Sequence, residues 1–237
     1  VTGIDLVYEQ IRIARGDELS FKQEEIEWNG HSIEARLYAE NPANNFLPVT
    51  GTLIAFEQNY NDKARWDSGV ESGSVIGTEF DPMLAKVISH AKTRKDAALK
   101  LSKSLESAHI GGVTTNRDFL ISTLRTEEFL DGKTTTDFID IVNPARALIL
   151  SKEMLMHSLA VAALWLQELN RFNDNVLGHL PSGWTNGRIP KQNISFKYND
   201  EEIEVLYTKL RDGNFNINNV YAKIFECFED GIDLEYN

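Results

Sequence analysis

The feature that most constrains the fold of this chain is a helical segment that is apolar on all sides. Residues 154–166 (MLMHSLAVAALWL) are apolar at every position except His157 and Ser158. A helix of this kind needs apolar neighbours around its whole circumference. A membrane span needs about 20 apolar residues, and this run is shorter, with Lys152-Glu153 before it and Gln167-Glu168 after it. We therefore expect a helix enclosed by other protein, such as a sheet wrapped around it.

The second half of the chain supplies both that helix and a sheet. We predict that the helix begins at Asn143-Pro144, with Asn as N-cap and Pro at the first helical position, and continues to about Phe172. Strands are predicted after it at 193–198, 203–210, 215–217, 222–228 and 232–236, separated by turn signals such as Asp212-Gly213. This pattern is typical of a long buried helix packed against an antiparallel sheet.

The first half alternates strands and helices. From 31 to 40, Ile33, Ala35, Leu37 and Ala39 fall on one face of a predicted strand, and Arg36 lies on the polar face with Glu34, Tyr38 and Glu40. Further strands are predicted at 52–58, 64–67 and 83–90, and helices at 2–16, 93–108, 116–125 and 126–131, the first two capped by Thr2 and Thr93. The fold class is therefore predicted to be α+β.

Charge and cysteine content exclude several classes of function. The net charge is -12 and the pI is about 4.9, without a basic patch, so we expect neither a nucleic-acid partner nor a membrane. The one cysteine, Cys227, permits no internal disulfide and indicates a reducing compartment. The sequence starts without Met and ends within a strand pattern, so we expect it to be part of a longer protein.

Familiar catalytic motifs are missing from the sequence. It contains no GxxxxGK[ST], GxGxxG, HExxH or GxSxG, and its five histidines are too far apart to predict a metal site. The glycine-containing run 71–78 lacks a lysine, so we interpret it as a structural turn. We expect His157 and Cys227 to be buried side chains rather than a ligand and a nucleophile.

Arg36 is the one candidate for chemistry. From spacing alone it is either a surface ion pair or a permanent cation placed to bind an anion or stabilise an oxyanion. The residues themselves leave both interpretations open.

A family resemblance bears on that choice. The stretches VTGIDLVYEQIRIARGDELSF, GHSIEARLYAENPANNFLPVTGTL, RWDSGVESGSVIGTEFDPMLAKVISHAKTRKDA and GGVTTNRDFL resemble, in this order, the C-terminal part of biotin carboxylase over residues 1–141. The resemblance implies an ATP-grasp ligase that uses ATP, magnesium and bicarbonate to carboxylate biotin. It implies that Arg36, in the GH-x-IE-x-R motif, contacts biotin and stabilises its enolate. No residue here matches the family's nucleotide, magnesium or general-base residues, so the chain is predicted to be inactive alone.

The second half is similar to another part of such enzymes. Residues 142–237, with ALWLQELNRFN and VLGHLPSGWTNGRIP, resemble the start of the docking domain of acetyl-CoA and propionyl-CoA carboxylase α subunits. There a long helix inside an antiparallel barrel binds the carboxyltransferase β subunit. The resemblance implies that this subunit and a biotin carboxyl carrier domain are partners. Trp184 is either an interface anchor or a side chain folded onto its own barrel.

Two functional readings follow from these resemblances. The chain is a piece of a ligase of fatty acid metabolism, or it is a non-catalytic module that docks a carboxyltransferase. We expect an oligomer, since an incomplete barrel leaves an open sheet edge. We expect a bacterial cytoplasm, with the mitochondrial matrix as the alternative.

Overall fold

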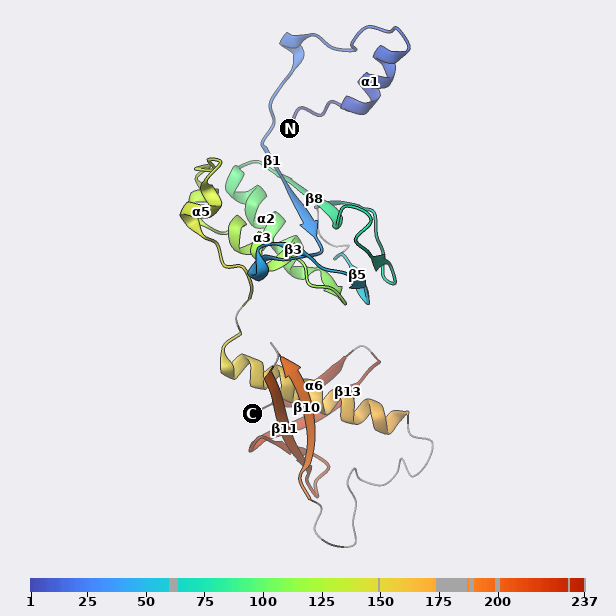
Figure 1. Cartoon of the computed structure of the whole chain (residues 1–237), viewed down its shortest axis with the longest axis vertical. Coiled ribbons are helices and arrows are strands. Elements are labelled where there is room, and N and C mark those ends of the chain that lie inside the picture. The colour runs from blue at the N-terminus through green and yellow to red at the C-terminus, as the bar shows by residue number, and fades with distance from the viewer. Residues whose placement is uncertain are drawn as a thin grey trace. The chain divides into compact units, whose positions relative to one another are not determined.

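The chain folds into two compact units. The computed structural model describes residues 1–59, 64–148, 150–173, 187, 190–198, 201–229 and 231–236 (Figure 1). The units are Val1–Leu148 and Ile149–Asn237. Both units combine α-helix with antiparallel sheet, which confirms the predicted α+β class.

A three-stranded antiparallel sheet forms the centre of the first unit. Its strands are β1 (His31–Tyr38), β8 (Met83–Ala91) and β6 (Arg65–Ser68), in the order β1-β8-β6. Helix α2 (Arg94–Ser107) packs on the inner face, where its fully buried Leu101 and Leu105 meet Ile33 and Ala35 of β1 and Val87 of β8. The outer face carries mainly polar side chains, with Ile88 between Glu34 and Arg65 as an apolar one.

The first unit also contains shorter elements. They are α1 (Leu6–Ala14), η1 (Gln23–Glu25), β2 (Glu40–Asn41), η2 (Pro42–Asn44), β3 (Leu47–Pro48), β4 (Gly51–Thr52), β5 (Ala55–Glu57), β7 (Val75–Ile76), β9 (His109–Gly111), α3 (Arg117–Leu124), α4 (Glu127–Leu130) and α5 (Phe138–Val142). The short strands pair as β2-β3, β4-β7 and β5-β9. They enclose a second apolar cluster built on Leu37, Leu53 and Leu84.

Thr93 caps α2 as predicted, through a bond from the amide of Asp96 to its side chain. Two other expectations for this unit were wrong. Asp5 rather than Thr2 caps α1, since Gly3 has a φ of +75°, outside the helical region. The strand predicted at 52–58 is broken, because β4 pairs with β7 whereas β5 pairs with β9.

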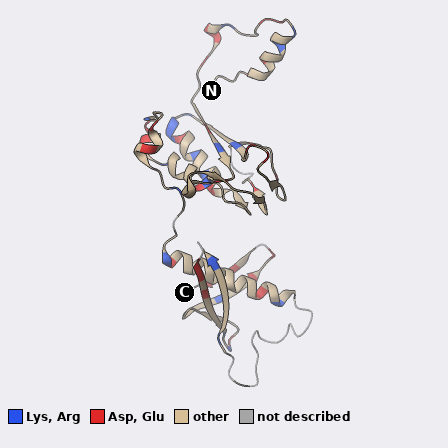
Figure 2. Cartoon of the chain, viewed as in Figure 1, with Lys and Arg blue, Asp and Glu red and all other residues tan. Residues whose placement is uncertain are grey.

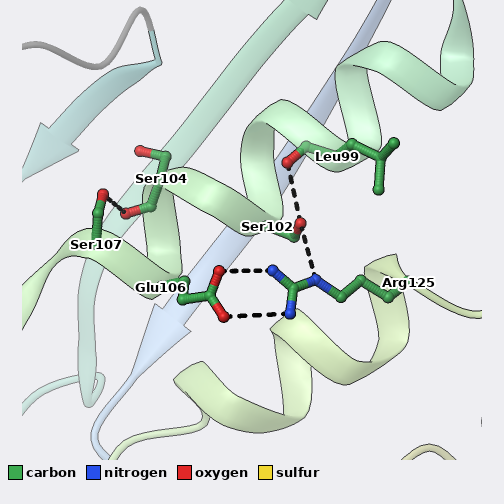
Figure 3. A network of polar contacts seen from close by, with 6 residues as sticks. All are labelled: Leu99, Ser102, Ser104, Glu106, Ser107 and Arg125. Carbon is green, nitrogen blue, oxygen red and sulfur yellow. Dashed lines mark hydrogen bonds and ion pairs between the residues drawn. The ribbon is translucent and has the colours of Figure 1, made fainter.

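A polar network joins α2 to the C-terminal end of α3 (Figure 3). Arg125, the C-cap of α3, donates from its two terminal nitrogens to Glu106 at 3.2 and 2.6 Å and from Nε to Ser102 at 3.4 Å. The hydroxyl of Ser102 donates in turn to the carbonyl of Leu99. The hydrogen bonds from Arg125 lower the pKa of Glu106, and burial opposes that shift.

The ion pair of Arg125 and Glu106 makes the free energy of unfolding depend on pH. A carboxyl whose pKa is lower in the folded state stabilises the fold above its unfolded pKa, and this contribution is lost as the pH falls through the folded pKa. We expect Arg125→Gln to lower the free energy of unfolding by at most about 1 kcal/mol at pH 7, because solvent screens the pair. The difference from wild type should shrink as Glu106 is protonated. Urea unfolding of both proteins between pH 7 and pH 3 measures it, and a difference independent of pH would contradict the assignment.

The second unit packs one helix against one sheet. Helix α6 (Lys152–Phe172) is followed by β10 (Gln192–Tyr198), β11 (Glu201–Lys209), β12 (Phe215–Ile217), β13 (Val220–Cys227) and β14 (Ile232–Tyr236), which pair antiparallel in chain order. On the helix, Ala160, Ala163 and Leu164 are fully buried. They pack against Val205, Tyr207, Phe215, Ile217 and Ala222 of the sheet. The prediction of a long helix on a partial antiparallel barrel is confirmed.

The predicted start of α6 was wrong. Asn143 lies in the left-handed region (φ +45°) and ends α5, and Ser151 caps α6 by accepting from the amide of Met154. Asn tolerates the left-handed conformation, and Pro commonly follows a helix end as well as a helix start. The Asn143-Pro144 signal therefore marks the end of a helix that the sequence reading did not include.

The sheet does not bury every side of α6 within the described residues. Met154 is 57% exposed, and His157, expected to be buried, is exposed and lies edge-on against Tyr236. Burial follows one stripe that includes Leu164 and Gln167. Across the described ranges, no helix has both the length and the apolarity that a bilayer crossing requires.

Candidate functional site

The outer face of the β1-β8-β6 sheet carries the candidate residue Arg36. Alternation along β1 buries Ile33, Ala35 and Leu37 and turns Glu34 and Arg36 outward. The polar face expected from the sequence is therefore present, and Arg36 does not point into the packed interior. Figure 2 marks the basic residues of these strands in blue and the acidic ones in red.

Arg36 is a fixed, solvent-accessible cation. Its Nε donates to Oε1 of Glu34 at 3.0 Å, and the two side chains are 58% and 42% exposed. Hydrogen bonds to Glu34 and Tyr38 raise the pKa of Arg36 above its ordinary value. The guanidinium thus stays charged at any working pH, and its fork of donors suits a planar oxyanion. Arg36 thus forms the surface ion pair and is also exposed to solvent, so its role as an anion-binding residue stays a prediction.

Asn116 holds the backbone of β1 beside Arg36. Its Oδ1 accepts from the amide of Tyr38 at 2.9 Å, and its Nδ2 donates to the carbonyl of Arg36 at 3.2 Å. Its own amide donates to the carbonyl of Tyr38 at 3.1 Å. The side chain is buried, at 6% exposure. From the sequence, Asn116 is predicted only as the start of a helix, because a contact between residues about 80 positions apart has no local signal.

Truncating that amide is expected to loosen the strand. Asn116→Ala leaves the amide of Tyr38 and the carbonyl of Arg36 without their side-chain partners, at a cost of about 2–3 kcal/mol. For a unit of this size the melting temperature should fall by roughly 4–12 °C. Differential scanning calorimetry measures it, with Asn44→Ala at an exposed position of η2 as the control. Equal melting temperatures of the two variants would show that the amide does not hold β1.

A pocket lies at the end of β8 that pairs with Tyr38. It has a volume of about 490 Å³, and its lining includes Val70, Phe80, Asp81 and Met83, the partner of Tyr38. Burial, and then the charge of Asp81, raise the pKa of Glu40. An opening next to the Arg36 strand is thus present in the first unit.

The other sequence candidates are structural within the described residues. The run 71–78 contains a turn at residues 72–73 followed by β7, and the amide of Glu71 donates to the hydroxyl of Ser74 while the amide of Phe56 donates to that of Ser72. No group of three or more metal-ligating side chains is found in the part of the chain that the structure describes. Cys227 is half-buried, and burial raises the pKa of its thiol, which disfavours a nucleophile. Trp184 lies outside the described residues.

Comparison with known proteins identifies the fold around this site. Residues 34–141 match the model of the biotin carboxylase C-terminal domain. The chain is 33% identical to the α subunit of mitochondrial methylcrotonoyl-CoA carboxylase of Rattus norvegicus, over 97% of this chain and 33% of that protein. It is 41% identical to biotin carboxylase 2 of Bacillus subtilis, over 59% of this chain and 31% of that protein. The chain thus spans about a third of these relatives.

Solved structures agree with the sequence matches. The biotin carboxylase domain of 2-oxoglutarate carboxylase of Hydrogenobacter thermophilus, bound to MgADP, ADP and bicarbonate, matches with a TM-score of 0.60 and 33% identity over 63% of this chain and 33% of that one. The complete pyruvate carboxylase of Rhizobium etli gives a TM-score of 0.62 and 32% identity over 69% of this chain and 16% of that one. Residues 34–141 are therefore similar, in sequence and in fold, to the biotin carboxylase C-terminal domain family.

Proposed function

We propose that this chain is the C-terminal part of the biotin carboxylase component in the α subunit of a biotin-dependent acyl-CoA carboxylase, and that Arg36 is its active-site residue. The observation that supports this most is the position of Arg36, an accessible, permanently charged guanidinium on the outer face of the matched domain. We propose residues 1–141 as the carboxylase part and 142–237 as the docking part.

The residues around Arg36 fit biotin. Biotin supplies a ureido group whose nitrogen is carboxylated and whose oxygen gains negative charge when that nitrogen loses its proton. Arg36 would hold this oxygen through its terminal nitrogens while Glu34 fixes its Nε. Asn116 holds the strand that carries it. A donor set in place before charge develops stabilises that charge without reorganisation.

ATP, magnesium and bicarbonate are proposed as the remaining reactants. The Hydrogenobacter domain, which resembles this chain over a third of its own length, binds MgADP and bicarbonate. No residue of this sequence matches the motifs that the family uses for them, so the chain supplies one wall of the site and the rest of the subunit supplies the others.

The purified 237-residue chain is therefore expected to show no bicarbonate-dependent ATP hydrolysis. The complete subunit that contains it should transfer the carbon of ¹⁴C-bicarbonate to free biotin only when ATP and magnesium are present. The two samples are compared at equal molar concentration, with release of phosphate and acid-labile ¹⁴C as the readouts. Bicarbonate-stimulated hydrolysis by the chain alone, or a complete subunit that cannot carboxylate biotin, would refute the proposal.

Docking of a carboxyltransferase is a second function, proposed for the second unit. The match to the rat α subunit covers 97% of this chain, whereas the match to the Bacillus biotin carboxylase covers 59%. The helix and sheet after residue 148 thus have their counterpart in an acyl-CoA carboxylase α subunit. We propose the carboxyltransferase β subunit and a biotin carboxyl carrier domain as partners, within an oligomer. The proposed role of Trp184 as an interface anchor stays a prediction.

The acyl-CoA and the compartment are further parts of the proposal. Acetyl-CoA and propionyl-CoA follow from the sequence resemblance, and the similarity to methylcrotonoyl-CoA carboxylase adds a third candidate. The choice among them belongs to the carboxyltransferase. We propose a bacterial cytoplasm, with the mitochondrial matrix as the alternative, and the rat relative is named as a mitochondrial protein.

A further inference from the structure

Arg36 has a second cation beside it on the sheet. In the register of β1 and β8, Arg36 lies directly opposite Lys86, and Lys86 lies opposite Asp67 of β6. Residues directly opposite each other on neighbouring strands have Cβ atoms about 4.5–5.5 Å apart and share one face. Arg36 and Lys86 are therefore immediate neighbours on the outer face.

Among the described residues, no acidic side chain forms an ion pair with Lys86. Asp67, its acidic neighbour on β6, accepts from Arg65 at 3.0 Å, and Glu34 accepts from Arg36. The backbone of Lys86 is paired in the sheet, but within the described ranges its ammonium has no hydrogen bond, and the residue is half-buried. Like charges directly opposite each other destabilise a sheet. A half-buried ammonium beside a guanidinium is thus a charge arrangement that an anionic ligand would relieve.

The local charge also differs from that of the whole chain. The three strands of this sheet carry three basic residues (Arg36, Arg65 and Lys86) and two acidic ones (Glu34 and Asp67), whereas the chain as a whole has a net charge of -12. An anion repelled by most of the surface is attracted here, because nearby charges dominate within a Debye length of about 8–10 Å.

We propose that Lys86 and Arg36 form one binding site for a single oxyanion, with Lys86 as its second cation. The inference rests on the proposed function and deepens it, since the ligand is an oxyanion of the carboxylation reaction. That oxyanion is either the charged ureido oxygen of biotin or a bicarbonate-derived group held against it. The planar guanidinium of Arg36 donates two hydrogen bonds to the oxyanion, and the ammonium of Lys86 adds a positive charge from the neighbouring strand.

Anion binding by the 237-residue chain tests the site without catalysis. The probe is inorganic phosphate, titrated at constant ionic strength and followed through amide shifts of β1 and β8 by NMR. Lys86→Met and Arg36→Met should each weaken binding at least fivefold, and Lys86→Arg should restore it. Lys95→Met, which removes the same charge from an exposed position of α2 on the other side of the sheet, is the control and should leave binding within twofold. Loss of binding in the control equal to that in Lys86→Met, or no effect of Lys86→Met, would overturn the proposal.

Steady-state kinetics of the complete subunit then identify the source of the oxyanion. If it is the ureido oxygen, Lys86→Met should lower kcat about tenfold with KM for biotin nearly unchanged, because the charge exists only in the transition state. If it is bicarbonate-derived, KM for bicarbonate should rise about tenfold instead. If Lys86→Met has wild-type kinetics while Arg36→Met is defective, only the role proposed for Lys86 is refuted. If Arg36→Met also has wild-type kinetics, both the proposed function and the role of Lys86 are refuted.

Discussion

Replacing Arg36 with alanine in the complete subunit is expected to lower ATP-dependent carboxylation of biotin by about 10²–10³-fold. Removal of one preorganised oxyanion donor costs about 2.7–4 kcal/mol of transition-state stabilisation. The guanidinium is accessible and held by Glu34 through Nε, so its terminal donors suit this task. Arg36→Lys keeps the positive charge but loses the paired N–H donors of the guanidinium, so it should retain only part of the wild-type rate.

The control is Lys95→Ala. Lys95 is exposed on α2, which packs on the inner face of the same sheet, so its removal should leave the rate within about twofold. Thermal unfolding must be measured for all variants. The pair of Arg36 and Glu34 is exposed and contributes little to stability, so Arg36→Ala should melt near wild type. A fully active Arg36→Ala, or one whose loss of rate equals its loss of folded protein, would remove Arg36 from the active site.

The sequence predicted this site only where the signal was local. Alternation along residues 31–40 placed Arg36 on the polar face, and the structure confirms that Ile33, Ala35 and Leu37 are buried opposite it. The sequence did not predict Lys86 as a site residue, because its place beside Arg36 depends on the register between β1 and β8, which pairs residues 50 positions apart. No local sequence pattern predicts that register.

The errors in the predicted fold also arise because local sequence does not determine tertiary contacts. Asn143-Pro144 suits both the end and the start of a helix, and the contacts of α5 rather than the dipeptide decide between them. The apolar run in α6 predicted burial, but composition could not show which stripe the sheet would cover. The structure buries Ala160, Ala163 and Leu164 completely and leaves Met154 exposed.

Removing the side chain of Leu164 is expected to have the largest effect on stability. Leu164 is fully buried in α6, among Val205, Phe215 and Ile217 of the sheet. A Leu→Ala change at such a site costs about 2–5 kcal/mol, from lost burial and from the cavity that remains. A unit of this length has a total stability of only about 5–13 kcal/mol. Leu164→Ala should therefore lower the melting temperature of the second unit by roughly 10–30 °C.

Calorimetry of the chain should show this shift in one transition only, because the core of the first unit is built from other residues, such as Leu101 and Leu105. Met154→Ala, on the exposed side of the same helix, is the control and should change stability by less than about 1 kcal/mol. If the second unit docks the carboxyltransferase, Leu164→Ala should also weaken copurification of the β subunit above the lowered melting temperature, while Arg36→Ala spares it. Equal melting of the Leu164 and Met154 variants would show that α6 is not held by this sheet, and the docking proposal would lose its structural basis.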